Sequence, residues 1–506
     1  MSDSDAAYDI IIVGLGPVGA ITAKLLANFD LTVLVLEKAK EIHSSPRAIH
    51  FDGEVMRVFQ NAGLATQIKK IARSTHKGMH FVGERNETLL IRKGVEGVGE
   101  QGWENNWYFF QPDLEKILRD SLQSHPNVTI RLGENVTSVR NTELKTQVIT
   151  KTDLNNDERY YESNWIIGCD GAKSLVSKSM AAKVEDLGLD EKWLVIDLIV
   201  SKDSPRAASL PDYTIQHCNP QRPMTRCYIN SSRRRWEIMV LPDDNIEEVT
   251  SEKFIWSILK PWLGPGDAVI ERAQIYTFHS IIKTAWKNSH MILAGDSAHQ
   301  SPPFLGQGLC AGIRDANSLA WRLGWVVEGK ANKSIIDSYV QERKSHVREF
   351  IDLAVSCGKI IKSGDPKLIA NYFKQESIEQ KNVFDFPKPQ LGSGVWMEGD
   401  PPLGQISPQF FDDVHALSDD NALYKLILFE RLGLKINLLR RSLQIVKNWD
   451  ITILKASKAV EKWFDCINVN ATLVRPDRYI YGLAIDLEGV TDMLDCFQID
   501  MNGKRD

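Results

Sequence analysis

The residues most suited to chemistry lie between positions 291 and 315, where a carboxylate, a proline and two glycines interrupt an apolar run. Asp296 stands directly after a short apolar stretch that is typical of a strand, and it can accept hydrogen bonds from a polyol. Pro303, Gly306 and Gly308 lead into a helical pattern, whose first backbone N–H groups are free to face an electron-rich group. The segment can therefore hold one polar ligand at two points, although a tight strand-to-helix connection without a ligand has the same composition.

A second glycine-rich turn lies near the start of the chain, after the continuous apolar run Tyr8–Val13. Such a run is typical of a parallel strand that is buried on both faces. A helical pattern follows, then a second strand over residues 31–36 that is ended by Glu37. This order is that of a dinucleotide site, in which glycines permit close approach of a pyrophosphate and the acid binds ribose hydroxyls. The turn itself contains Gly14, Gly16, Pro17 and Gly19.

Two further segments carry candidate ligand contacts. Arg47 lies in a polar stretch, where it is either a cation beside the ligand or an ordinary surface arginine. Farther on, apolar residues 165–167 lead into Asp170, a second acidic strand end, and a helix is expected from Ser174. Chance seldom places a GxGxxG turn and two such strand ends, at Asp170 and Asp296, in one chain.

These three motifs resemble those of the single-component, FAD-dependent (class A) aromatic hydroxylases of the p-hydroxybenzoate hydroxylase fold, over roughly residues 8–350. The resemblance implies that the glycine turn and Glu37 bind the ADP half of FAD, and that Asp296 meets the ribityl chain. Asp170 would belong to a motif used for both FAD and NAD(P)H. The chain departs from the family's DGxxSxVR pattern at Ser177, where arginine is usual, so handling of the nicotinamide cofactor is affected. The further implied FAD contacts are Lys38, Arg47, Gln111, Pro303, Gly306, Gly308, Leu309 and Cys310.

The chemistry implied by the resemblance is that of a monooxygenase. NADPH or NADH reduces FAD, O2 then forms a flavin C4a-hydroperoxide, and an OH group passes to a phenolic ring. The same intermediate can support epoxidation, oxidative decarboxylation or Baeyer-Villiger oxidation of a polyketide-like substrate, and no sequence feature separates these outcomes. Alternatives from other classes are a non-catalytic FAD-binding scaffold or sensor, and an NAD-linked dehydrogenase.

A phenolic substrate needs a group that helps it lose its proton, and the candidate catalytic residues are His50 and Asp52. The alternative for Asp52 is that it caps the helix that begins near Gly53. Strand-like runs between residues 194 and 241 predict an antiparallel sheet. In the resembled family this sheet roofs the flavin and lines the substrate pocket. The candidate substrate contacts in this sheet are its polar aromatic residues His217, Tyr228, Trp236 and His279. The alternative is that these side chains only pack within the sheet domain.

The predicted fold is α/β, with a Rossmann-like FAD-binding domain in two parts, residues 1–185 and 286–385, around an antiparallel-sheet substrate domain at 186–285. The Pro- and Gly-rich residues 386–404 predict a linker. Residues 405–506 contain LVRPDRYIYG at positions 473–482, and they resemble the C-terminal thioredoxin-like domain of the phenol hydroxylase and 3-(3-hydroxyphenyl)propionate hydroxylase branch. Because this domain lacks CxxC, a structural or dimeric role is expected rather than thiol redox chemistry.

Composition excludes several other classes. The net charge of −5 and the dispersed basic residues predict no nucleic-acid partner, and the one basic run, Arg233 to Arg235, is expected to be a solvated turn. The seven cysteines lack metal-ligand spacing, so no metal is expected. No apolar run approaches about 18 residues, and the acidic N-terminus resembles no targeting peptide. We therefore expect no membrane span and a cytoplasmic location. The partners expected are a small phenolic substrate and O2, and a homodimer is the family's common state.

Overall fold

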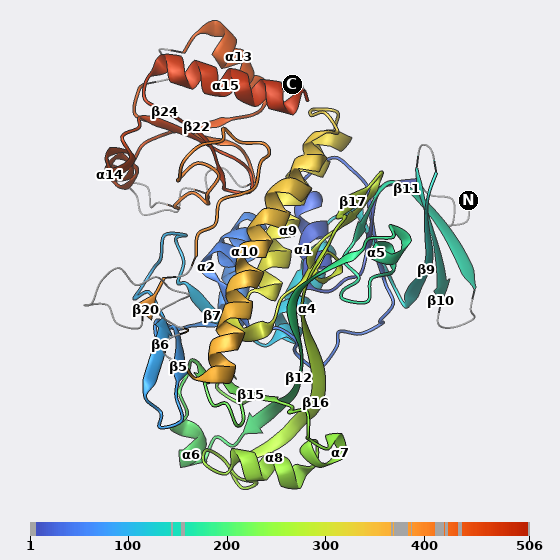
Figure 1. Cartoon of the computed structure of the whole chain (residues 1–506). Coiled ribbons are helices and arrows are strands. Elements are labelled where there is room, and N and C mark those ends of the chain that lie inside the picture. Colours follow the sequence, from blue (N-terminus) through green and yellow to red (C-terminus); the bar gives the residue numbers. More distant parts are fainter. Residues whose placement is uncertain are drawn as a thin grey trace.

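The computed structural model describes residues 7–142, 145–152, 157–365, 368, 383–385, 387–409, 419, 424–433 and 438–503. Within these residues the chain forms two large sheets, a smaller C-terminal sheet and a three-stranded sheet. Figure 1 shows the C-terminal part at the top, the long antiparallel strands at the bottom, and strands of the parallel sheet at the right.

The first large sheet is built on five parallel strands and extended by antiparallel ones. Its strands are β1 (Ala7–Val13), β2 (Val33–Glu37), β8 (Val128–Leu132), β9 (Glu134–Asn141), β10 (Thr146–Thr152), β11 (Glu158–Gly168), β17 (Lys287–Asn288) and β18 (Met291–Leu293). The parallel order is β8-β2-β1-β11-β18. Ile12 lies between Val35 and Ile167, and all three are fully buried. β1 is therefore the parallel strand, buried on both faces, that its apolar run predicts.

Helices and 3-10 turns pack around this sheet. They are α1 (Pro17–Leu26), α2 (Gly53–Asn61), α3 (Ala65–Ile71), α4 (Gln111–Leu122), α5 (Leu175–Ser179), η2 (Gly295–Ser297), η3 (Pro303–Leu305), α9 (Gly308–Val327) and α10 (Ile335–Ser363). The predicted helix near Gly53 is confirmed as α2, and the one predicted from Ser174 as α5, which Ser174 caps. Gln111 begins α4. α1 packs against α4 and α9. None of the described helices is both long and apolar enough to cross a bilayer.

A three-stranded sheet lies next to α2. Its strands are β3 (His50–Asp52), β4 (Arg73–Ser74) and β7 (Asn106–Tyr108), in the order β3-β7-β4. All three residues of β3 are buried, and β3 leads directly into α2. The candidate catalytic residues His50 and Asp52 therefore stand at the two ends of a short, rigid strand.

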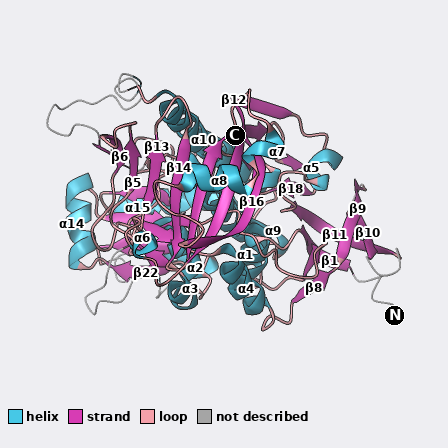
Figure 2. Ribbon diagram, turned by 90° about the horizontal axis from the view of Figure 1, so that it is seen from below, coloured by secondary structure: helices cyan, strands magenta, loops and turns pink. Residues whose placement is uncertain are grey.

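The second large sheet is mainly antiparallel. Its strands are β5 (Met79–Val82), β6 (Thr88–Arg92), β12 (Val184–Val200), β13 (Thr214–His217), β14 (Met224–Asn230), β15 (Arg233–Met239), β16 (Ala268–Lys283), β19 (His299–Gln300) and β20 (Val383–Phe384). One face is covered by three helices, α6 (Pro205–Ala208), α7 (Ile246–Val249) and α8 (Glu252–Leu259), of which α7 and α8 lie over the strands in Figure 2. The sheet is larger than the insertion at 186–285, because β5 pairs with β13 and brings in β6 and β20.

Two local sequence predictions are wrong. Arg233 to Arg235 do not form a solvated turn but begin β15, and Arg235 is only 2% exposed. The reason is Asp197 on the neighbouring β12, whose carboxylate lies 2.7 Å from the Arg235 guanidinium and compensates its buried charge. The polar run at residues 153–162 predicts a hairpin tip. β10 and β11 do pair antiparallel, but residues 158–162 form part of β11 rather than of the tip. The rest of that predicted tip, residues 153–156, lies outside the described residues.

The C-terminal part forms a four-stranded sheet with helices on it. Its elements are β21 (Ile427–Glu430), α13 (Arg440–Asn448), β22 (Thr452–Lys455), α14 (Lys458–Ile467), β23 (Ala471–Val474), β24 (Ile480–Ala484) and α15 (Leu487–Met501). The sheet order is β22-β21-β23-β24, with β21 parallel to β22 and antiparallel to β23. This β-α-β-α-β-β-α arrangement is the predicted thioredoxin-like fold. The preceding residues 387–404 contain no helix or strand, yet Val395 and Trp396 are each 5% exposed, so this linker is packed against the protein.

Candidate functional site

The glycine turn after β1 contains three differently packed glycines. A Cβ atom on Gly14, whose φ is 100°, would lie 2.5 Å from the carbonyl oxygen of Cys169. One on Gly19 would lie 2.0 Å from the carbonyl oxygen of Gly14, so neither position accepts a side chain. A Cβ on Gly16 would meet no atom within 4 Å. The turn thus leaves open space at the start of α1, where Pro17 is the first helical residue and a pyrophosphate fits.

Glu37 and Lys38 lie beside this turn, at the end of β2. The two carboxylate oxygens of Glu37 accept hydrogen bonds from the backbone N–H groups of Leu15, at 2.7 Å, and Ala39, at 2.8 Å. The carboxylate therefore braces the glycine turn in addition to any contact with a ribose. Lys38 is exposed. Ribose binding by Glu37 and an FAD contact by Lys38 stay predictions.

Arg47 is held at its backbone and exposed at its side chain. The Oε1 atom of Gln111 accepts hydrogen bonds from the N–H groups of Arg47, at 2.9 Å, and Ala48, at 2.7 Å. From the other side, Arg235 donates a hydrogen bond to the carbonyl oxygen of Arg47 at 2.7 Å. The structure therefore brings together the predicted contacts Arg47 and Gln111. Arg235 was missed as a functional residue, although three adjacent arginines in a strand must place at least one on an inner face.

Asp170 caps a helix and keeps one oxygen free. Its Oδ2 atom accepts hydrogen bonds from the N–H groups of Leu175 and Val176 at 2.6 and 3.3 Å, at the start of α5. Its Oδ1 atom is buried and has no hydrogen-bond partner. Burial raises the pKa of Asp170 above its ordinary value, because the charged form loses hydration. A buried acceptor of this kind is expected to meet a donor from a ligand.

Asp296 is exposed at the end of β18, and buried groups hold the backbone around it. The N–H group of Gly295 donates to Asp315 at 3.0 Å, and His299 lies 2.7 Å from the same carboxylate oxygen. The other Asp315 oxygen accepts from Arg343 at 3.0 Å. Asp315, His299 and Arg343 were not predicted. No local sequence pattern marks this group, because its members come from α9, β19 and α10.

The loop before α9 is closely packed at one glycine and open at the next. Gly306 has φ 65°, and a Cβ there would lie 2.9 Å from His50 Nδ1. A Cβ on Gly308 would meet no atom within 4 Å. No side chain caps α9, and the Nε2 atom of Gln307 is buried without a partner, so donors converge at this end of the helix. The loop is completed by Pro303 at the start of η3, half-buried Leu309 and buried Cys310.

His50 is buried between polar groups that face both of its ring nitrogens. Nε2 lies 3.3 Å from Asn106 Oδ1, and Nδ1 lies 3.5 Å from the carbonyl oxygen of Gly306. Asn106 also accepts a hydrogen bond from Arg92. Burial, with a smaller contribution from the charge of Arg92, lowers the pKa of His50 to about 4. Tyr108 packs edge-on against its ring at 5.5 Å between centroids.

Asp52 has partners for both carboxylate oxygens. Oδ1 accepts from the N–H group of Val55 at 3.0 Å and caps α2, as the alternative prediction held. Oδ2 accepts from Arg314 of α9 at 2.6 Å. Although burial alone would raise its pKa, the Arg314 charge and the Val55 N–H group hold the pKa of Asp52 below its ordinary value. Arg314, which was not predicted, also lies 2.7 Å from Glu54.

The structure brings only one of the four substrate candidates toward this site. Tyr228 packs edge-on against Tyr108, with ring centroids 5.7 Å apart. His217 and Trp236 instead contact Trp262 on the face covered by α8, and half-buried His279 lies 3.4 Å from Asp190. These three side chains lie away from this site, because neighbouring residues of a strand point to opposite faces.

The face of the sheet opposite α8 carries different residues, and these lie toward the loop before α9. Gln216, next to His217 in β13, donates to the carbonyl oxygen of Phe304 in η3 at 3.1 Å. Thr225 of β14 donates to Gln216. Phe304 also packs against Trp193, with ring centroids 5.2 Å apart. The residues of this sheet that reach the loop, Gln216 and Trp193, are therefore ones that sequence reasoning did not select.

Open space at Gly16 and Gly308, exposed Arg47 and Asp296, and an unpaired oxygen on Asp170 fit a long dinucleotide with a polyol chain. The fold and the site thus define an α/β dinucleotide-binding protein with a sheet over one end of the cofactor. A family model described as "FAD binding domain" matches residues 7–354. The chain belongs to this FAD-binding family, as the sequence resemblance implied.

Similarity to known proteins extends over nearly the whole chain. The chain is 32% identical over 501 residues to a "Probable NADH-specific resorcinol 4-hydroxylase" of Rhodococcus jostii, and the alignment covers 95% of this chain and 92% of the relative. It is 29% identical over 538 residues to a "3-(3-hydroxy-phenyl)propionate/3-hydroxycinnamic acid hydroxylase" of Burkholderia cenocepacia, covering 97% and 96%. A crystal structure of aklavinone-11 hydroxylase with FAD and aklavinone has the same fold, with TM-score 0.81, 19% identity and coverage of 99% and 100%. The chain is an FAD-dependent monooxygenase.

Proposed function

We propose that this monooxygenase hydroxylates a small phenolic substrate, with NADH as electron donor and O2 as oxygen donor. The observation that carries the proposal is the likeness, over nearly the full chain, to a relative named for resorcinol and for NADH. A second relative of similar coverage is named for phenolic acids, so both names share a hydroxylated benzene ring. NADPH is the alternative donor. The predicted domain boundaries, cytoplasmic location and homodimer likewise stay predictions.

The chain's own residues are assigned to binding and positioning. FAD, when bound, supplies the transfer of electrons from NADH to O2 and of one oxygen atom to the ring. We assign the ADP half to the turn at Gly16 and to Glu37, and the ribityl chain to Asp296. The N–H groups at Gly308 would lie at the flavin ring, because the positive end of a 20-residue helix stabilises negative charge there. Arg47 adds a cation whose backbone is already held in place.

His50 is the proposed group that receives or relays the phenol's proton. With its pKa at about 4, the ring is neutral near pH 7, so one nitrogen carries a hydrogen and the other a lone pair. Asp52 is the weaker candidate, because its two oxygens accept hydrogen bonds from Val55 and Arg314 at 3.0 and 2.6 Å. The ring nitrogens of His50 have longer contacts, at 3.3 and 3.5 Å. We therefore assign Asp52 to holding α2 and α9 together beside His50.

The proposal is tested with purified protein and a panel of phenols. Resorcinol or another simple phenol is expected to stimulate NADH oxidation and O2 uptake, and mass analysis should show one added oxygen atom. Phenolic acids and NADPH are measured in parallel, which separates the two substrate types and the two donors. A protein that binds FAD but is stimulated by no phenol would show the proposal to be wrong.

Replacing His50 with glutamine is expected to lower the rate of hydroxylation by about a hundredfold, the lower range for loss of a proton-transferring group. FAD should stay bound, because glutamine has a similar size and His50, although it lies beside Gly306, is not itself a proposed FAD contact. More of the consumed NADH should appear as hydrogen peroxide. The measurement compares product and peroxide per NADH. His279→Gln is the matched control, because its half-buried side chain lies beside Asp190, and it should be coupled like the wild type. Equal coupling in both variants would remove His50 from the mechanism.

A further inference from the structure

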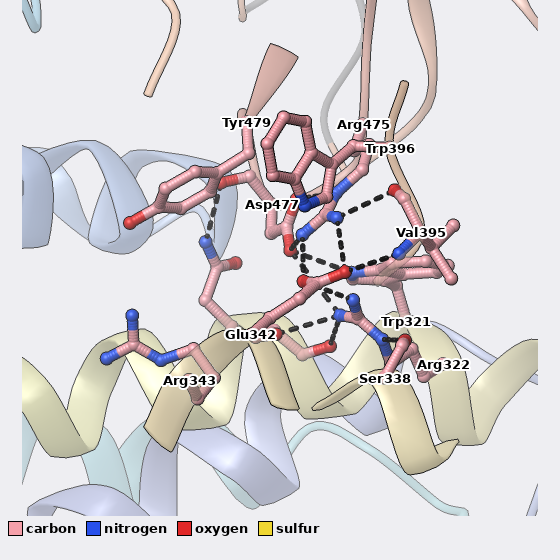
Figure 3. Close-up of polar contacts among 12 residues, drawn as sticks. Trp321, Arg322, Ser338, Glu342, Arg343, Val395, Trp396, Arg475, Asp477 and Tyr479 are labelled. Atoms are coloured by element: carbon pink, nitrogen blue, oxygen red, sulfur yellow. Dashed lines mark hydrogen bonds and ion pairs between the residues drawn. The ribbon is translucent and has the colours of Figure 1, made fainter. Parts of the chain in front are cut away.

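The turn between β23 and β24 belongs to the C-terminal domain but is buried against helices of the FAD-binding part. Arg475 donates to Glu342 of α10 through both terminal nitrogens, each at 2.9 Å. Asp477 accepts from Trp321 of α9 at 3.1 Å and lies 3.6 Å from Arg322 (Figure 3). The side chains of these two ion pairs, Arg322 with Asp477 and Arg475 with Glu342, are at most 1% exposed. The turn is therefore held rigidly across the interface between the two parts.

Tyr479 follows this turn, and its hydroxyl reaches residues of the candidate site. It donates to Glu54 Oε1 at 3.0 Å, and Glu54 Oε2 lies 2.7 Å from Arg314 Nε. Arg314 then donates to Asp52 at 2.6 Å and to Gln307 at 3.1 Å. Gln307 directly precedes the open Gly308, so this branch of contacts ends at the proposed flavin loop.

A second branch leads from the same hydroxyl to the other cofactor loop. Tyr479 lies 3.3 Å from His346 Nε2, and His346 Nδ1 lies 2.8 Å from Arg343. Arg343 donates to Asp315 at 3.0 Å, and Asp315 accepts from the N–H group of Gly295 at 3.0 Å. Gly295 directly precedes Asp296. The two branches therefore meet at the Tyr479 hydroxyl. They connect the loop at Asp296, which we assign to the ribityl chain, with the loop at Gly308, which we assign to the flavin ring.

The chemistry of the donors sets the direction of these hydrogen bonds. Arginine has no acceptor, so His346 must accept at Nδ1 and carry its hydrogen on Nε2. That hydrogen faces the Tyr479 oxygen, which leaves the Tyr479 hydroxyl to donate to Glu54. Burial holds the pKa of His346 well below its ordinary value, in keeping with the neutral ring that this arrangement requires. Removing the hydroxyl would leave a buried donor on His346 and a mostly buried acceptor on Glu54 unpaired.

We propose that Tyr479 is a positioning residue through which the C-terminal domain aligns both cofactor loops, and so sets FAD affinity and the coupling of NADH oxidation to hydroxylation. The part of this proposal that concerns coupling rests on the proposed function. The part that concerns FAD affinity does not depend on which substrate is used. The role goes beyond the structural or dimeric one expected for a thioredoxin-like domain without CxxC.

The test compares Tyr479→Phe with Tyr481→Phe. Tyr481 is the matched control, because it lies in the same strand and its buried hydroxyl also donates to a carboxylate, Asp500, at 2.6 Å within the C-terminal domain. Tyr479→Phe is expected to weaken FAD binding about fivefold, the ratio for a lost hydrogen bond of ordinary strength. It should also raise the peroxide released per NADH. Tyr481→Phe should change neither, while thermal melting of both apoproteins reports any general loss of stability.

A double-mutant cycle with Glu54→Gln distinguishes action through Glu54 from an unrelated effect. If Tyr479 acts through Glu54, Tyr479→Phe should change FAD affinity much less in the Glu54→Gln background than in the wild type. Wild-type FAD affinity and coupling in Tyr479→Phe, with a lowered melting temperature alone, would overturn the positioning role. A wild-type protein that binds FAD but hydroxylates no phenol would overturn the proposed function and leave the affinity measurement valid.

Discussion

Replacing Gly308 with valine is expected to deprive the protein of FAD while the apoprotein stays folded. A Cβ at this position would meet no protein atom within 4 Å, so the side chain would occupy only the space assigned to the flavin. Gly308 is the first residue of α9 and its φ is not positive, so valine brings no backbone strain there. Overlap with a bound ring is expected to weaken FAD affinity about a hundredfold, the upper range for overpacking. Flavin content and the FAD dissociation constant measure the effect.

Gly266→Val is the matched control for Gly308. A Cβ on Gly266 would also meet no atom within 4 Å, but this residue lies just before β16, in the part of the chain that carries α8. The control should bind FAD like the wild type and melt at a similar temperature. Undiminished flavin content and turnover in Gly308→Val would contradict the placement of the flavin at the start of α9.

Replacing Glu342 with glutamine is expected to destabilise the protein by about 3–5 kcal/mol, the usual effect of removing one partner from a buried ion pair. Glu342 and its partners Arg475 and Arg322 are all 0% exposed. Its carboxylate accepts hydrogen bonds from both arginines and from the N–H group of Val395 at 2.7 Å. Glutamine has nearly the same shape but replaces one acceptor with a donor, so two buried cations lose part of their compensation.

Urea unfolding and limited proteolysis measure this effect, and the first cleavages are expected near residues 387–404 and in the C-terminal domain. Glu271→Gln is the control, because Glu271 also pairs with an arginine, Arg233, through two carboxylate oxygens. These two side chains are 26% and 24% exposed, so their pair should contribute no more than about 1 kcal/mol. Similar losses in the two variants would mean that the network in Figure 3 is not what joins the C-terminal domain to α9 and α10.

Which side chains of the antiparallel sheet face the site could not be predicted from the sequence. The antiparallel strands were predicted close to where they lie, because apolar patterns and turn residues are local signals. Which residues face the flavin loop depends on pairing with distant strands, and a shift of one residue reverses the two faces. His217 was therefore chosen where its neighbour Gln216 reaches the loop, and Trp236 where the opposite face carries Arg235.

Which charged residues are buried could not be predicted from the sequence, for a related reason. An arginine in a sequence is expected at the surface unless its partner is known, and the partners here are far away along the chain. Arg235 is neutralised by Asp197 from another strand, and Arg475 by Glu342, 133 residues away, in addition to nearby Asp477. Asp52 was correctly recognised as a possible cap for α2, because a cap is a contact with the next few residues.

The sequence by itself determined that a dinucleotide binds, since Gly14, Gly16 and Gly19 need only a strand and a helix beside them to form a phosphate-binding turn. It also determined the order of the elements and the absence of CxxC. Only the tertiary structure decided which side chains share a site, because that depends on contacts between segments hundreds of residues apart. Tyr479, 425 residues from Glu54 along the chain, is the clearest example: no local pattern marks it, yet its hydroxyl joins both cofactor loops.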